Sequence, residues 1–134
     1  MKTFIAGSAV FLAIAGFMAP QAGQAQSLQG MHRQDLSRHN LSIPGYEEVQ
    51  ARVDLDPGAT APNHKHPGEE IIYVIEGTLT YRLEGRPPVT LKAGDVLFVP
   101  AGVVHSATNV GQTEAAELGT YIVPIGKPLV ELVK

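Results

Sequence analysis

Glycine and proline interrupt this 134-residue chain at short intervals through most of its length. Pro57-Gly58, Pro67-Gly68 and Gly94-Asp95 are strong turn signals that stop one apolar segment before the next begins. The segments between such turns are roughly four to eight residues long, as strands usually are, and none after the N-terminal segment has helical spacing. Short strands separated by regular turns are typical of a sandwich or barrel. The sequence therefore predicts an all-β domain.

The alternation of apolar and polar residues is clearest in the segment 47–55. Val49, Ala51, Val53 and Leu55 fall on one face there, and polar side chains fall on the other. A continuous apolar segment at 96–99 has the character of a buried strand. Together with these two, we expect strands at 70–76, 78–83, 89–91, 103–108 and 115–123.

Residues 1–25 have the features of a secretory signal peptide. Lys2 precedes an apolar run over residues 4–19, and small side chains at −3 and −1 predict a cut before Gln26. The run is shorter than the ~20 residues that span a bilayer, so cleavage is favoured over an uncleaved anchor. We expect a periplasmic or secreted bacterial protein with no membrane attachment after cleavage. Translation from Met31 would instead leave the same domain in the cytosol.

Residues 26–45 are polar without a sustained period, and we expect an N-terminal arm with one short strand near 41–43. The β domain itself is expected at 46–134. His32 and His39 lie in the arm with no neighbour at ligand spacing, so we expect both on the surface.

Charge and cysteine content exclude several functions. The chain has 10 Lys and Arg against 13 Asp and Glu, a formal net charge of −3, and no basic cluster. Nucleic acid is therefore not an expected partner. Cysteine is absent, so disulfides and thiolate ligands are excluded. Histidine, aspartate and glutamate are left as the strong side-chain metal ligands.

A candidate metal site begins with His64 and His66, which precede a pair of acids, Glu69 and Glu70. Side chains at i and i+2 of an extended strand point to the same face, so both imidazoles can reach one ion. A third histidine, His105, lies in a later segment between glycine- and proline-rich turns. Three neutral imidazoles and one carboxylate suit a divalent transition metal.

The spacing of these residues resembles the two motifs of the cupin superfamily, and the chain is similar to its small single-domain members. Residues 58–77 read G-x5-H-x-H-x3-E-x6-G, and residues 94–109 read G-x5-P-x-G-x2-H-x3-N. The resemblance implies a jelly-roll barrel of about six to eight strands. It also implies a metal site in the barrel mouth, made by His64, His66, Glu70 and His105.

Glu70 is favoured over Glu69 because only Glu70 keeps the motif spacing to Gly77. Asn109 is expected to form a turn rather than to bind the metal. Four protein ligands saturate a tetrahedral zinc ion, whereas octahedral Fe(II), Mn(II) or Ni(II) keeps two positions open. We therefore expect Fe, Mn or Ni rather than Zn or Cu.

A divalent ion with one carboxylate ligand leaves about one positive charge, which favours a bidentate anionic oxygen ligand such as oxalate or an enediolate. Apolar residues near the ligands are expected to form the substrate pocket: Ile72, Val74, Phe98 and Val103. No catalytic residue is assigned. Packing or surface roles are expected for Tyr81, Arg82 and Tyr121, and surface positions for Glu76, Glu84 and Glu117.

By family analogy, the leading functional hypothesis is a metal-dependent dioxygenase or oxidase that acts on a small oxygen-rich molecule. The alternatives are a non-catalytic module that binds a small molecule through the metal, and a sugar or keto-acid isomerase or epimerase.

The strand at 70–76 is apolar on both faces. If Glu70 points inward, Ile71, Tyr73 and Ile75 point outward, and a strand of this kind is usually covered on both sides. We therefore expect a homodimer, with coverage by the N-terminal arm as the alternative.

Overall fold

The computed structural model describes residues 28–134, so the expected signal peptide lies outside the described residues. This range contains ten strands: β1 (Met31–Asn40), β2 (Tyr46–Leu55), β3 (Thr60–Lys65), β4 (Glu69–Glu76), β5 (Thr78–Leu83), β6 (Val89–Lys92), β7 (Val96–Val99), β8 (His105–Asn109), β9 (Ala115–Pro124) and β10 (Glu131–Leu132). Within the same range, no helix is long and apolar enough to cross a bilayer.

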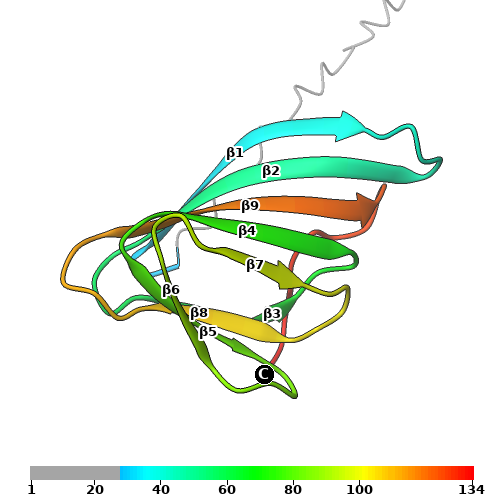
Figure 1. Cartoon of the computed structure of the whole chain (residues 1–134). Coiled ribbons are helices and arrows are strands. Elements are labelled where there is room, and N and C mark those ends of the chain that lie inside the picture. The colour runs from blue at the N-terminus through cyan, green and yellow to red at the C-terminus, as the bar shows by residue number, and fades with distance from the viewer. Residues whose placement is uncertain (1–27) are drawn as a thin grey trace, which may run out of the picture.

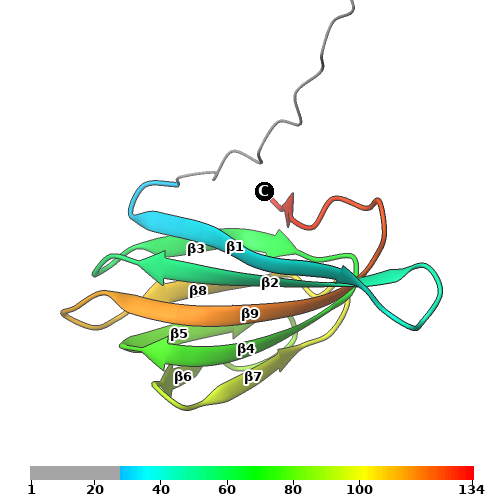
Figure 2. The same ribbon diagram turned by 90° about the horizontal axis from the view of Figure 1, so that it is seen from above.

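The strands form two antiparallel five-stranded sheets that face each other (Figure 1). One sheet has the order β1-β2-β9-β4-β7, and the other has the order β10-β3-β8-β5-β6. After β9, the C-terminal segment leaves the first sheet and crosses to the edge of β3 in the second (Figures 1 and 2). The predicted all-β jelly-roll fold is therefore confirmed.

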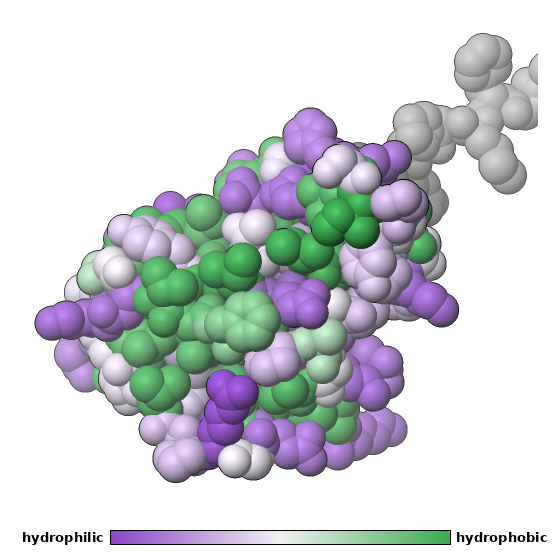
Figure 3. All heavy atoms as spheres, turned by 45° about the vertical axis from the view of Figure 1, so that its right-hand side comes forward, coloured by the Kyte–Doolittle hydropathy of each residue, from purple (hydrophilic) through white to green (hydrophobic). Residues whose placement is uncertain are grey.

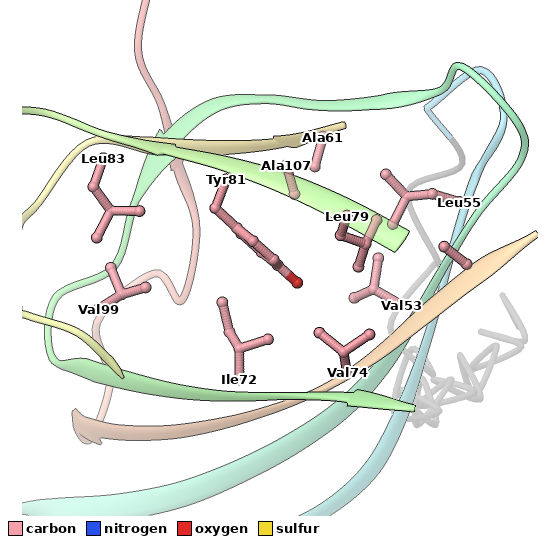
Figure 4. Close-up of a cluster of buried hydrophobic side chains, with 11 residues drawn as sticks. Val53, Leu55, Ala61, Ile72, Val74, Leu79, Tyr81, Leu83, Val99 and Ala107 are labelled. Atoms are coloured by element: carbon pink, nitrogen blue, oxygen red, sulfur yellow. The ribbon is translucent and has the colours of Figure 1, made fainter. Parts of the chain in front are cut away.

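The core lies between the two sheets. The four apolar residues that alternate along β2, Val49, Ala51, Val53 and Leu55, are each at most 7% exposed, as the pattern predicts. Figure 4 shows apolar side chains from both sheets converging on the space between them. Removing a valine or leucine side chain from water stabilises a fold by about 1.5–3 kcal/mol, so this layer is the main source of stability.

The N-terminal arm differs from the expectation. Residues 31–40 form the ten-residue strand β1, which pairs with β2 from Met31–Leu55 to Asn40–Glu47. The short strand expected near 41–43 is wrong, because these residues belong to the connection between β1 and β2. An edge strand is held by backbone hydrogen bonds, so β1 forms without a regular apolar pattern. His32 and His39 are exposed on it, as expected.

Strand β7 is buried on one face only, so the expected burial of segment 96–99 is wrong in part. Val99 is 1% exposed, whereas Val96 and Phe98 are 59% and 51% exposed. These two residues pair with Tyr73 and Ile71 of β4, which also face outward. The four side chains form an apolar outer face on β4 and β7. Figure 3 shows that apolar residues are also gathered in patches on one side of the molecule.

Candidate metal centre

Four side chains from two separate segments of the chain, 64–70 and 105, meet between the sheets. His64 in β3 pairs directly with His105 in β8, and His66 lies just after β3. Ligand nitrogens of the three histidines lie within 4.8 Å of one another. Glu70, at the start of β4, places Oε2 3.2 Å from Nε2 of His66 and 3.1 Å from Nε2 of His105. The structure thus brings together the four residues singled out by the motif spacing, whereas Glu69 alternates to the other face of β4.

Backbone carbonyls orient all three imidazoles. Each Nδ1 atom lies at hydrogen-bonding distance from a carbonyl oxygen: Pro62 for His64 (2.7 Å), Leu129 for His66 (2.7 Å) and Val103 for His105 (2.9 Å). A carbonyl can only accept, so we assign the hydrogen to each Nδ1 and a free lone pair to each Nε2. Metal-binding histidines are usually oriented by partners of this kind.

The donor set fits a metal ion. Nε2 of His66 is buried, and within residues 28–134 it makes no hydrogen bond despite its distance to Glu70. In the assigned tautomers, three nitrogen lone pairs and a carboxylate converge with no hydrogen among them. A buried polar group left unpaired costs about 1–3 kcal/mol. A divalent cation would pair with all four groups at once, which is the strongest reason to regard the cluster as a metal centre.

Burial and neighbouring charges favour the metal-binding protonation states of His64 and Glu70, but not that of His105. Burial, with a smaller effect of His105, lowers the pKa of His64 to about 4, so this imidazole is neutral at pH 7. Burial opposes ionisation of Glu70, but contacts with His105 and His66 outweigh it and hold the pKa of Glu70 below its usual range. For His105, burial lowers the pKa and the Glu70 carboxylate raises it, with a net upward shift.

Tyr121 is a wall of the site. Its ring packs edge-on against His66 with a centroid separation of 4.8 Å, and only 3% of the residue is exposed. Gly119 leaves room for this arrangement, because an added Cβ would lie 2.7 Å from the Tyr121 hydroxyl and 3.0 Å from Oε1 of Glu70. Burial, followed by the negative charge of Glu70, raises the pKa of Tyr121, so the phenol stays neutral.

Glu117 corrects the expectation of surface charge. It is 6% exposed inside the barrel and accepts a hydrogen bond from the Tyr81 hydroxyl, which points between the sheets in Figure 4. Burial and the negative charge of Glu70 raise the pKa of Glu117. The alternation along β9 could have located it, since Glu117 shares a face with Tyr121. Tyr81 is buried in the core, and Arg82, Glu76 and Glu84 are exposed, as expected.

Replacement of Glu117 by glutamine should change the pH dependence of stability. As the pH rises above about 4.3, a glutamate in the unfolded chain releases its proton, whereas native Glu117 retains its proton up to its raised pKa. The free energy of unfolding of wild type therefore decreases as the pH rises through this range. The free energy of unfolding of Glu117→Gln, relative to that of wild type, should therefore increase by at least ~1 kcal/mol from pH 4.5 to pH 7.5. Urea unfolding of the metal-free proteins measures this difference. Exposed Glu84→Gln is the control and should show no such gain. A Glu117→Gln difference that stays constant with pH would contradict the prediction.

A cavity of about 90 Å³ opens beside the histidines, between β1 and the C-terminal segment. Most of its wall is apolar, and its polar lining comes from Arg33, His64, His66, Glu117 and Tyr121. None of the residues expected to form the pocket lines this cavity. Ile72 and Val74 are 1% and 0% exposed in the core, and Val103 packs against the same core cluster. Phe98 is on the outer face of β7, opposite to the expectation, because its neighbours Leu97 and Val99 face inward.

Three groups beside the histidines were not predicted from the sequence. The Leu129 carbonyl and the Val130 side chain reach the site only because the C-terminal segment crosses between sheets. Arg33 reaches it because β1 is part of the first sheet. No local pattern around these residues distinguishes them from surface positions.

Residues 51–123 match the family model described as "Cupin domain". The oxalate-binding protein of Thermotoga maritima is 41% identical over 73 residues, covering 54% of this chain and 60% of that protein. Germin-like protein 1 of Brassica napus is 40% identical over 76 residues, covering 53% and 37%. A crystal structure of recombinant oxalate oxidase in complex with glycolate superimposes with a TM-score of 0.64 at 26% identity, covering 84% and 59%. This chain thus spans less than two-thirds of the length of each.

Proposed function

This chain belongs to the cupin family, and from that premise we propose that it binds a divalent Fe, Mn or Ni ion and acts as an oxidase or dioxygenase on a small, oxygen-rich anion. His64, His66, His105 and Glu70 would hold the ion. The observation that carries the proposal is the convergence of three imidazoles, each held through Nδ1 by a backbone carbonyl, with one buried carboxylate.

The ion would supply Lewis-acid polarisation of substrate oxygens and a redox partner for O₂. The protein provides the rest of the environment. Tyr121 and the apolar cavity wall reduce the polar surface beside the histidines, which strengthens electrostatic interactions within the site. Glu117 keeps a proton on its carboxyl group at the same cavity because its pKa is raised.

Two observations favour a substrate of the size of oxalate. Pockets for drug-sized ligands usually occupy about 300–1,000 Å³, whereas this cavity has about 90 Å³. Flavonol-sized molecules are therefore poor candidates for this cavity. One relative is named an oxalate-binding protein, and one similar solved structure is an oxalate oxidase in complex with glycolate, an acid of the same carbon number.

A non-catalytic binding protein is the second candidate function. It is supported by the Thermotoga maritima relative, which is called an oxalate-binding protein. Such a protein would use the same ion and cavity to hold the anion without transforming it.

Reconstitution tests these functions together. Metal-free protein is loaded with Fe(II), Mn(II) or Ni(II), the bound metal is quantified, and O₂ consumption and loss of oxalate are followed. Metal-dependent O₂ consumption that is absent in Glu70→Gln supports the oxidase. Saturable oxalate binding without turnover supports the binding protein, and anaerobic conversion of a sugar or keto acid supports an isomerase. Failure to retain any of the metals would overturn the proposal as a whole.

We also propose that the apolar outer face of β4 and β7 forms a homodimer interface. The alternative cover, the N-terminal arm, lies elsewhere, because β1 pairs with β2 at the opposite edge of this sheet. Ile71, Tyr73, Val96 and Phe98 are therefore left exposed in a single chain. Sedimentation velocity should give about twice the monomer mass, and a monomer at micromolar concentration would reject the proposal.

Localisation in the periplasm or outside the cell is a proposal that rests on residues 1–25. Sequencing of the mature N-terminus after expression in a bacterium should find Gln26 first. An N-terminus at Met31 would exclude export by this route.

A further inference from the structure

We propose that Arg33 recognises a second carboxylate on the substrate, so that the site selects small dicarboxylates over monocarboxylates of the same size. This inference rests on the proposed function, and it names the substrate class more narrowly. Arg33 lies outside the matched residues 51–123, so the comparison with the family assigns it no role.

The position of β1 directs Arg33 into the cavity. Arg33 pairs with Val53 of β2, whose side chain is 7% exposed and faces the interior. Neighbouring side chains on paired strands share a face, so Arg33 points to the same side. Both residues line the cavity beside the histidines, and the Arg33 side chain is 19% exposed.

Tyr121 links Arg33 to the metal centre. The guanidinium carbon lies 5.7 Å from the centroid of the Tyr121 ring, within the range of a cation–π contact. The same ring also packs against His66, at a centroid separation of 4.8 Å. A short molecule attached to the ion can therefore extend along Tyr121 towards the guanidinium.

The guanidinium retains donors for a ligand. Asp35 accepts from Nε and lies 2.8 Å from Nη2, both through Oδ1. Because the Asp35 side chain is 64% exposed, this is a surface ion pair, which solvent weakens. Among the described residues, no acid pairs with Nη1 of Arg33. A carboxylate binds well to two parallel N–H groups of arginine, so the open edge suits a second acidic group.

The charges match a dianion. A divalent ion with Glu70 leaves about one positive charge, and Arg33 adds a second in a cavity with a largely apolar wall. A monocarboxylate on the ion would leave Arg33 paired only with the exposed Asp35, whereas oxalate would place a carboxylate near both positive groups. The volume of about 90 Å³ limits the ligand to a few non-hydrogen atoms.

Oxalate and glycolate provide a matched pair, because they differ by one carboxylate. Binding of each to the Mn(II)-loaded protein is measured by calorimetry without O₂, and bound Mn is quantified. Arg33→Gln should weaken oxalate binding about 10- to 100-fold, the loss expected for hydrogen bonds to a charged group. Glycolate binding and Mn content should remain within about threefold of wild type. Arg33→Lys should recover part of the oxalate affinity, since it keeps the charge but not the planar donor pair.

Arg82→Gln is the control, because it removes the same charge from an exposed position and should leave the oxalate-to-glycolate ratio unchanged. If folded Arg33→Gln bound Mn and glycolate as wild type does, and the ratio of oxalate to glycolate affinity did not change, this inference alone would be overturned. An equal loss for both acids would overturn it as well. If wild type retained none of Mn, Fe or Ni, the proposed function would fail, and the inference would fail with it.

Discussion

His66→Ala should lower the affinity for a divalent transition metal by more than about 100-fold. Loss of an outer partner of a ligand typically costs about 10- to 100-fold, and His66 contributes a ligand atom itself. Its Nε2 has no hydrogen-bonding partner among the described residues, and its Nδ1 is already held by Leu129. The substitution leaves two histidines and Glu70, a set with one nitrogen fewer and a more open coordination sphere. Calorimetric titration with Mn(II) and metal analysis after dialysis would measure the loss.

His32→Ala is the matched control, since His32 is exposed on β1. It removes the same side chain from the same protein and should not change metal affinity. Unfolding of both variants without metal separates loss of a ligand from loss of folding. Retention of one tightly bound ion by folded His66→Ala would show that the centre is not built as proposed.

Gly68→Ala should lower the free energy of unfolding by roughly 3 kcal/mol or more, at the upper end of the usual cost of overpacking. A Cβ on Gly68 would overlap the carbonyl oxygen of Ile122 and lie 2.9 Å from Cα of Val123. These are backbone atoms of β9, which is hydrogen-bonded to β2 and β4 on its two sides, so they cannot move away cheaply. Metal affinity should fall too, because Gly68 lies in the turn between His66 and Glu70.

Gly111→Ala provides the comparison for this substitution. The nearest atom to its added Cβ is Oδ1 of Asn109 at 3.3 Å, at the end of a side chain. We expect a loss of no more than about 1 kcal/mol there. Urea unfolding without metal gives both stabilities, and titration with Mn(II) gives the second effect. Equal stability of the two variants would mean that the β3–β4 turn does not pack against β9 as described.

The motif residues were predictable because their geometry is partly local. His64 and His66 share a face in any extended conformation, and Glu70 must point inward if Ile72 and Val74 do. Asn109 was expected to form a turn, and its amide hydrogen-bonds to the backbone of Leu55, Thr113 and Gly111. Such features need only the strand period and the order of turns.

The errors arose where coverage by another element matters. The period of 96–99 is compatible with burial on either face, and the edge position of β7 leaves Phe98 outside. Glu117 is a charged residue of the kind usually found on the surface, yet it faces inward because it alternates in phase with Tyr121 and Val123 along β9. Because residues 26–45 are polar, they were expected to form an arm outside the β domain. In the structure, β1 joins the first sheet through backbone pairing with β2.

By itself, the sequence determined the all-β class, the alternation along β2 and the histidines and glutamate that share the candidate metal centre, because strand periodicity and motif spacing are written in neighbouring residues. The tertiary structure alone decided that Arg33 and the Leu129 carbonyl lie beside that centre. Their positions depend on which sheet edge and which chain terminus lie beside the histidines, and those neighbours are set by long-range strand pairing rather than by local pattern.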